Sequence, residues 1–223
     1  MLVPALLVAI PVHEMGHAAA AYFQGDRSVR YFGYFTLNPR RFLDPLGVIA
    51  VFALLVGWGR KVPVQPNRIS SVRQRLVHAL GGPAANLLAA IVFGLALRVL
   101  LAAGYRAAPE LSLDLVTYLV YAIVFLNLSM FAFNLLPFPG LDGWDVIETI
   151  FRRRNPRFFF NATVRRREIV VGGVAAILIS SFIGLPLLSL VMTPFYEPAS
   201  LISVGRCLSY RIPGLNVLDP CRL

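Results

Sequence analysis

Charged residues are scarce in this chain of 223 residues: Asp, Glu, Lys and Arg make up 14% of it, whereas hydrophobic residues make up 57%. Soluble globular domains carry about 25% charged residues, so the composition excludes an ordinary soluble domain. A chain of this length has room for about four to six membrane crossings in one compact bundle. We therefore expect an all-α polytopic membrane protein.

Acidic residues are fewer than basic ones: the chain has 11 Asp and Glu but 21 Lys and Arg, which gives a net charge of +10. In a soluble protein this excess would suggest a nucleic-acid partner. The arginines, however, cluster in loops between apolar runs, and no stretch interleaves basic and aromatic residues on a polar background. This distribution follows the positive-inside rule of membrane proteins, so we expect a lipid bilayer and no nucleic acid as partner.

Long apolar runs provide the spans, each of which needs roughly 20 residues as a helix. A fifth, shorter run, residues 46–58, is expected to re-enter the membrane or lie at its surface, and whether it spans is left open. The basic loops 59–77 and 152–167 should face the cytoplasm. The four predicted spans are residues 1–23, 78–103, 115–136 and 169–192.

The first of these runs is not expected to be a signal peptide. It lacks a basic segment at its start, and it carries His, Glu and His in its middle, where signal peptides are apolar. We therefore expect it to remain as a span, with Met1 outside the cytoplasm. On this topology we divide the chain into a membrane domain, residues 1–193, and an extracytoplasmic tail, residues 194–223.

Cysteine is almost absent, and both cysteines, Cys207 and Cys221, fall in the predicted tail. Outside the cytoplasm such a pair can oxidise. A disulfide between them is a hypothesis, and we do not expect them to bind metal.

Two loop segments favour β-structure. Residues 29–37 and 60–65 are rich in aromatic and β-branched side chains. They predict a small membrane-associated β element, with the alternative that the aromatic side chains anchor the chain at the bilayer surface.

Histidine is also rare, yet two of the three histidines lie in the first span in the pattern His-Glu-x-x-His. On a helix His13 and His17 share one face and can hold one Zn²⁺, and Glu14 stands beside them to activate water. Ionisable groups inside a membrane are costly and usually mark function. At 1.5 Å per residue His13 lies about 15 Å from the cytoplasmic end of the helix, at Phe23.

A zinc site of this kind needs a third protein ligand and an open position. His78 and Asp142 are the candidates, with Asp145 behind them. Asp142 follows the helix-breaking segment 137–140, where irregular backbone at membrane depth must be buried or line a cavity; the alternative is a surface turn. His78 heads an apolar run, and its alternative role is that of an interfacial histidine.

Three motifs occur in one order along the chain: His13-Glu14-Met15-Gly16-His17, Gly82-Pro83-Ala84-Ala85-Asn86, and Asn134-Leu135-Leu136-Pro137 followed by Leu141-Asp142-Gly143. In this order they resemble the site-2 protease family of intramembrane zinc metalloproteases, of the bacterial and archaeal type without a PDZ domain. The similarity covers roughly residues 5–150, which would form the catalytic core.

The resemblance implies that His13, His17 and Asp142 ligate one Zn²⁺ per chain and that Glu14 is the general base and acid. It also suggests that two asparagines, Asn86 and Asn134, bind the substrate. The implied reaction is hydrolysis of peptide bonds in or near transmembrane segments of other proteins. The implied location is a bacterial or archaeal cell membrane. The depth of His13 and the basic loops together predict an active site toward the cytoplasm. The sequence predicts neither the individual substrate nor the oligomeric state.

Two other functions are alternatives to proteolysis. A membrane metal transporter would need His, Asp or Glu along several spans, and beyond the motifs these spans are nearly bare of them. A non-catalytic scaffold of the same fold has no need of the catalytic residues, whereas all of them are present. Both alternatives are therefore weaker predictions than a protease.

Overall fold

The structure is a computed structural model that describes the whole chain except residues 37, 46–58, 61, 66, 106–112 and 209–223. The run 46–58 and Cys221 lie outside the described residues, so the disulfide and the course of that run stay predictions. The described part is helical, which confirms the fold class. Its helices are α1 (Leu2–Phe23), α2 (Ser28–Tyr31), η1 (Pro39–Arg41), α4 (Val72–Ala102), α5 (Leu113–Asn134), α6 (Asp142–Phe151), α7 (Pro156–Val164), α8 (Arg166–Phe182) and α9 (Leu187–Val204).

Four of these helices are long and apolar enough to cross a membrane: Leu2–Phe23, Val72–Ala102, Asp114–Asn134 and Leu187–Val204. The first three confirm the predicted spans. The fourth prediction, residues 169–192, is wrong because it joins the end of α8 to the start of α9. Gly184 takes a φ of +78° between the two helices, and Pro186 disfavours helix in the residue before it.

Hydropathy alone could not detect this break, since the residues that separate α8 from α9 are themselves apolar. One consequence concerns the predicted tail, because position 193 falls inside α9. The division of the chain between residues 193 and 194 stays a prediction.

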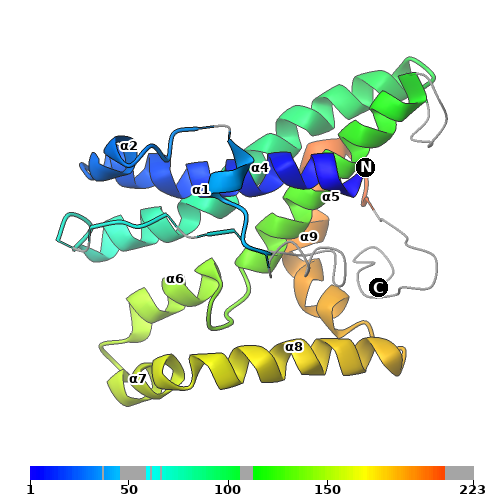
Figure 1. The fold of residues 1–223 in the computed structure, drawn as a ribbon. Helices are drawn as coiled ribbons and strands as arrows, with labels where there is room; N and C mark the ends of the chain where they lie inside the picture. The colour runs from blue at the N-terminus through cyan, green and yellow to red at the C-terminus, as the bar shows by residue number, and fades with distance from the viewer. Residues whose placement is uncertain (37, 46–58, 61, 66, 106–112, 209–223) are drawn as a thin grey trace.

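The core of the fold is formed by α1, α4, α5 and α9. Helix α1 lies beside α4, α5 packs against both of them, and α9 packs against α4 and α5 (Figure 1). From the end of α5, α6 and α7 lead to α8, which lies on the opposite side of the molecule from α1 (Figure 1). The outer face of α4 carries a row of exposed apolar side chains at helical spacing, as expected of a surface that meets lipid: Leu88, Val92, Leu95 and Val99.

Glycines bring α1 and α4 into backbone contact. A Cβ atom on Gly16 of α1 would stand only 2.4 Å from the carbonyl oxygen of Gly81 in α4. Small residues allow membrane helices to approach in this way. Any larger side chain at these positions would separate the two helices.

The predicted β element is not present among the described residues. Its first segment begins as helix α2, because the buried carboxylate of Asp26 accepts a hydrogen bond from the Ser28 backbone N–H (3.1 Å) and fixes the start of this turn. The same carboxylate accepts a bond from the Gln65 backbone N–H (2.7 Å) and ties down the second segment. Near that segment the structure has an isolated antiparallel bridge between Leu43 and Gly59.

The contact between α4 and α9 generates a stability prediction. A Cβ on Gly94 of α4 would lie 2.5 Å from the carbonyl oxygen of Ser203 in α9. We expect Gly94→Ala to push the helices apart and lower the free energy of unfolding by about 1–3 kcal/mol, measured by thermal unfolding in detergent.

The matched control is Gly172→Ala in α8, where a new Cβ meets no atom within 4 Å. This variant should keep the wild-type stability or exceed it slightly. If both variants unfolded at the same temperature, α4 and α9 would not be packed as closely as described.

Candidate metal centre

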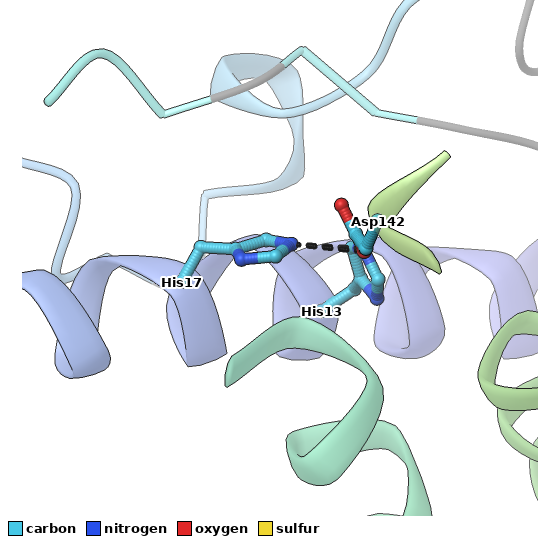
Figure 2. A group of neighbouring side chains, drawn as sticks. All are labelled: His13, His17 and Asp142. Carbon is cyan, nitrogen blue, oxygen red and sulfur yellow. Dashed lines mark hydrogen bonds and ion pairs between the residues drawn. The ribbon is translucent and has the colours of Figure 1, made fainter. Parts of the chain in front are cut away.

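Three side chains from two distant parts of the chain converge beside the middle of α1 (Figure 2). The Nε2 atoms of His13 and His17 are 3.2 Å apart, and the Oδ2 atom of Asp142 lies 3.1 Å from the first and 3.2 Å from the second. All three residues are buried, with exposed fractions of 7% or less. The three atoms therefore form a compact, nearly equilateral triangle.

This triangle fits a zinc ion. Nitrogen and oxygen ligands bind zinc at about 2.0–2.2 Å, so at tetrahedral angles they stand roughly 3.3 Å apart. The measured separations of 3.1–3.2 Å come close to this value. Two imidazoles and one carboxylate, with the fourth position open, are also a ligand set of catalytic rather than structural zinc.

Helix α1 positions the two histidines, and the turn between α5 and α6 positions the carboxylate. His13 and His17 are four residues apart, so they project from the same face of α1. Helix α5 ends at Asn134 and α6 begins at Asp142, after a turn in which Gly140 has a φ of +114°. A Cβ on Gly143 would stand 2.2 Å from the Leu135 carbonyl oxygen, so this tight turn depends on glycine.

Both imidazoles are oriented from behind by hydrogen bonds at Nδ1. His13 Nδ1 lies 2.6 Å from Asn86 Oδ1, and His17 Nδ1 lies 2.8 Å from the carbonyl oxygen of His78. A backbone carbonyl only accepts, so His17 Nδ1 must carry the proton, and the same holds for His13 if Asn86 presents its oxygen. The lone pairs of both Nε2 atoms then face the centre, as metal binding requires.

Glu14 directly follows His13 on α1 and is enclosed. The residue is 3% exposed, and a Cβ on Gly59 would stand 2.8 Å from its Oε1 atom. Gly59 pairs with Leu43, and the Arg60 N–H donates to the Phe42 carbonyl oxygen at 2.7 Å. The carboxylate therefore lies between α1 and an extended stretch of the chain that covers it.

Of the two candidate third ligands, Asp142 is the one that joins the histidine pair. His78 contributes its carbonyl oxygen instead, and its ring lies 5.2 Å from that of His17. His78 also lines a cavity of about 520 Å³. Polar and charged residues line much of this cavity together with His78, among them Arg75, Asp145, Glu148, Arg152 and Arg153.

The two asparagines predicted to bind substrate have different surroundings. Asn86 is fully buried, and its amide contacts His13, the Ala9 carbonyl oxygen and Asn127. Asn134 is 4% exposed and donates to the Met130 carbonyl oxygen of its own helix. A role of either asparagine in substrate binding stays a prediction.

Two residues at the site were not identified from the sequence. A Cβ on Gly82 would lie 2.4 Å from His17 Nε2 and 2.8 Å from His13 Nε2, so bare backbone of α4 faces the metal position. Asn127 of α5 contacts Asn86 and is fully buried. The signal for Asn127 was present, because a lone amide in the middle of an apolar span is costly unless it has a purpose.

Comparison with known proteins places the chain in a family. The family model "Peptidase family M50" matches residues 1–181. Among curated relatives, the chain is 38% identical over 152 residues to "Putative zinc metalloprotease YwhC" of Bacillus subtilis (strain 168), a match that covers 67% of this chain and 68% of the relative. It is 36% identical over 167 residues to "Putative zinc metalloprotease Rip2" of Mycobacterium tuberculosis (strain H37Rv), a match that covers 70% of this chain.

The Rip2 match extends over 60% of that relative, so the chain spans less than two thirds of its length. No solved structure matches the chain. The family model covers most of the chain, and it includes the three converging residues and the first three of the four candidate membrane spans. The chain is therefore an integral membrane member of peptidase family M50, the site-2 protease family.

Proposed function

We propose that this chain is an intramembrane zinc metalloprotease that hydrolyses peptide bonds in or near the transmembrane segments of other membrane proteins. The observation that carries the proposal is the buried triangle of His13, His17 and Asp142, which has the ligand spacing of zinc and lies halfway along a membrane-spanning helix. The family, and the zinc metalloprotease names of its relatives, support the same activity.

The chemistry divides between the metal and Glu14. Zinc, when bound by His13, His17 and Asp142, acts as a Lewis acid that activates water and polarises a carbonyl oxygen. The Glu14 carboxylate accepts the proton of the attacking water and later donates it to the amine nitrogen of the leaving peptide. Its enclosed position keeps bulk water away from this proton transfer.

The active site is proposed to face the cytoplasmic side of a bacterial or archaeal cell membrane. Support comes from the cavity beside His78, because Arg75, Arg152 and Arg153 line it and clusters of arginine favour the cytoplasmic side. We propose that water approaches the metal centre from this cavity, because His78 lines it and the His78 ring lies 5.2 Å from that of His17. A helical substrate hides its peptide groups in its own hydrogen bonds, so it has to unwind locally before cleavage.

The decisive experiment combines zinc counting with cleavage of a panel of single-span substrates by detergent-purified protein. The wild type should hold one zinc per chain and cleave at least one substrate. Glu14→Gln should keep the zinc and lose about 10²-fold or more of the cleavage rate, because the proton acceptor is gone. Asp142→Ala should lose the zinc, because only two ligands remain.

The possible outcomes separate the competing functions. Zinc in the wild type without cleavage of any substrate would favour a scaffold that has kept the metal. A wild type that holds no zinc would refute the proposed metalloprotease. Full cleavage by Glu14→Gln would refute the role proposed for this carboxylate.

A further prediction concerns Gly82, where the metal position borders bare backbone. Gly82→Ala would place a methyl group 2.4 Å from His17 Nε2, which must then move. We expect zinc affinity to fall by at least about tenfold, the lower end of what displaced ligand geometry costs. A chelator competition titration would measure this.

Gly172→Ala is again the control, since it adds the same methyl group in open space. It should bind zinc as the wild type does. Equal zinc affinity of Gly82→Ala and the wild type would mean that the metal does not lie against α4.

A further inference from the structure

We propose that Asn127 is a positioning residue for His13 and acts on it through Asn86. This inference builds on the proposed zinc site. The three side chains come from α5, α1 and α4 and form one hydrogen-bonded chain. His13 Nδ1 lies 2.6 Å from Asn86 Oδ1, Asn86 Nδ2 lies 2.8 Å from Asn127 Oδ1, and Asn127 Nδ2 lies 2.8 Å from the Ile123 carbonyl oxygen.

Two backbone carbonyls fix the orientation of the Asn86 and Asn127 amides in this series of hydrogen bonds. Asn86 Nδ2 also lies 3.0 Å from the carbonyl oxygen of Ala9. A carbonyl oxygen only accepts hydrogen bonds, so the amide nitrogen of Asn86 must face Ala9 and its oxygen must face His13. By the same argument, the Ile123 carbonyl requires the nitrogen of Asn127, which turns the Asn127 oxygen toward Asn86.

The orientation of the Asn86 amide decides which ring nitrogen of His13 carries the proton. Because Asn86 presents an oxygen, His13 Nδ1 must carry the proton and donate it. The lone pair of His13 then resides on Nε2, the atom that faces His17 and Asp142. The hydrogen-bonded chain therefore selects the tautomer of His13 that can bind a metal.

Burial makes each hydrogen bond between His13, Asn86 and Asn127 important for the orientation of these side chains. Asn86 and Asn127 are fully buried and His13 is 4% exposed, so bulk water cannot replace a lost partner. Without the Asn127 oxygen, one N–H of the Asn86 amide would lose its acceptor in a dry site. The Asn86 amide would then no longer be held in the orientation that His13 needs.

His17 provides an internal reference. Its Nδ1 atom is held by the backbone carbonyl of His78 and not by an amide side chain. A substitution at Asn127 should therefore alter His13 and leave His17 unchanged. A general loss of structure would affect both histidines.

The test begins with zinc affinity, measured by competition with a chelator. Asn127→Leu should weaken zinc binding by about tenfold, and Asn86→Leu by about tenfold to a hundredfold, as found when partners of metal-binding histidines are removed. If Asn127 acts through Asn86, the double variant Asn86→Leu/Asn127→Leu should lose no more than Asn86→Leu alone.

Two further variants separate positioning from folding. Ser129→Ala changes another fully buried polar residue of α5 and should keep the wild-type affinity. Asn127→Asp keeps the shape of the side chain, and a carboxylic acid that is protonated in this buried place can donate to Ile123 and still accept from Asn86. It should bind zinc more tightly than Asn127→Leu does.

The second readout is the NMR spectrum of protein labelled with ¹⁵N in its three histidines. In Asn127→Leu and Asn86→Leu the Nδ1–H signal of His13 should shift or vanish while that of His17 stays. An unchanged His13 signal in Asn127→Leu, or additive losses of zinc affinity in the double variant, would overturn the proposal. If the wild type bound no zinc, the proposed function would fail, and the His13 signal of the metal-free protein would still decide this inference.

Discussion

The direct contact between the backbones of α1 and α4 is the constraint on which the rest of the structure depends. Gly16 and Gly81 leave no side chain between the two helices, and Gly82 leaves none between α4 and the histidines. Only at this short separation can His78 and Asn86 of α4 reach the imidazoles of α1. Glycine at these positions therefore determines the geometry of the metal centre as much as the ligands do.

The second requirement is that helix α5 ends shortly before Asp142. Helix α5 is apolar and buried along much of its length, and it ends where Gly140 and Gly143 permit a turn that a larger side chain could not make. The turn directs Asp142 toward α1. Because backbone at membrane depth cannot bond to water, such a turn is stable only inside the protein, where it also borders the metal site.

The sequence predicted the metal centre better than the course of the chain. The spacing of His13 and His17, set in an apolar helix, pointed to a zinc site directly. The residues alone left both His78 and Asp142 open as the third ligand, and the family resemblance favoured Asp142. Neither signal revealed Asn127, whose importance arises only from its contact with Asn86 in another helix. The role of Gly82 was equally hidden, since a short residue can serve packing anywhere in a membrane helix.

The errors have physical causes as well. The break between α8 and α9 falls in apolar sequence, so hydropathy merged the two helices into one span. Aromatic and β-branched residues around Val29 suggested a strand, but the local hydrogen bonds that Asp26 accepts favoured a helical turn. In the second case local contacts outweighed the propensity of the residues themselves.

The distance along the chain between the parts of the metal centre has a consequence for biosynthesis. His17 and Asp142 are separated by 125 positions, and helices α4 and α5 lie between them in the chain. A ribosome completes the first helix long before it completes the residue that closes the triangle. A partly inserted chain therefore holds its two histidines without their carboxylate, so a complete metal centre arises only after the bundle has assembled around it.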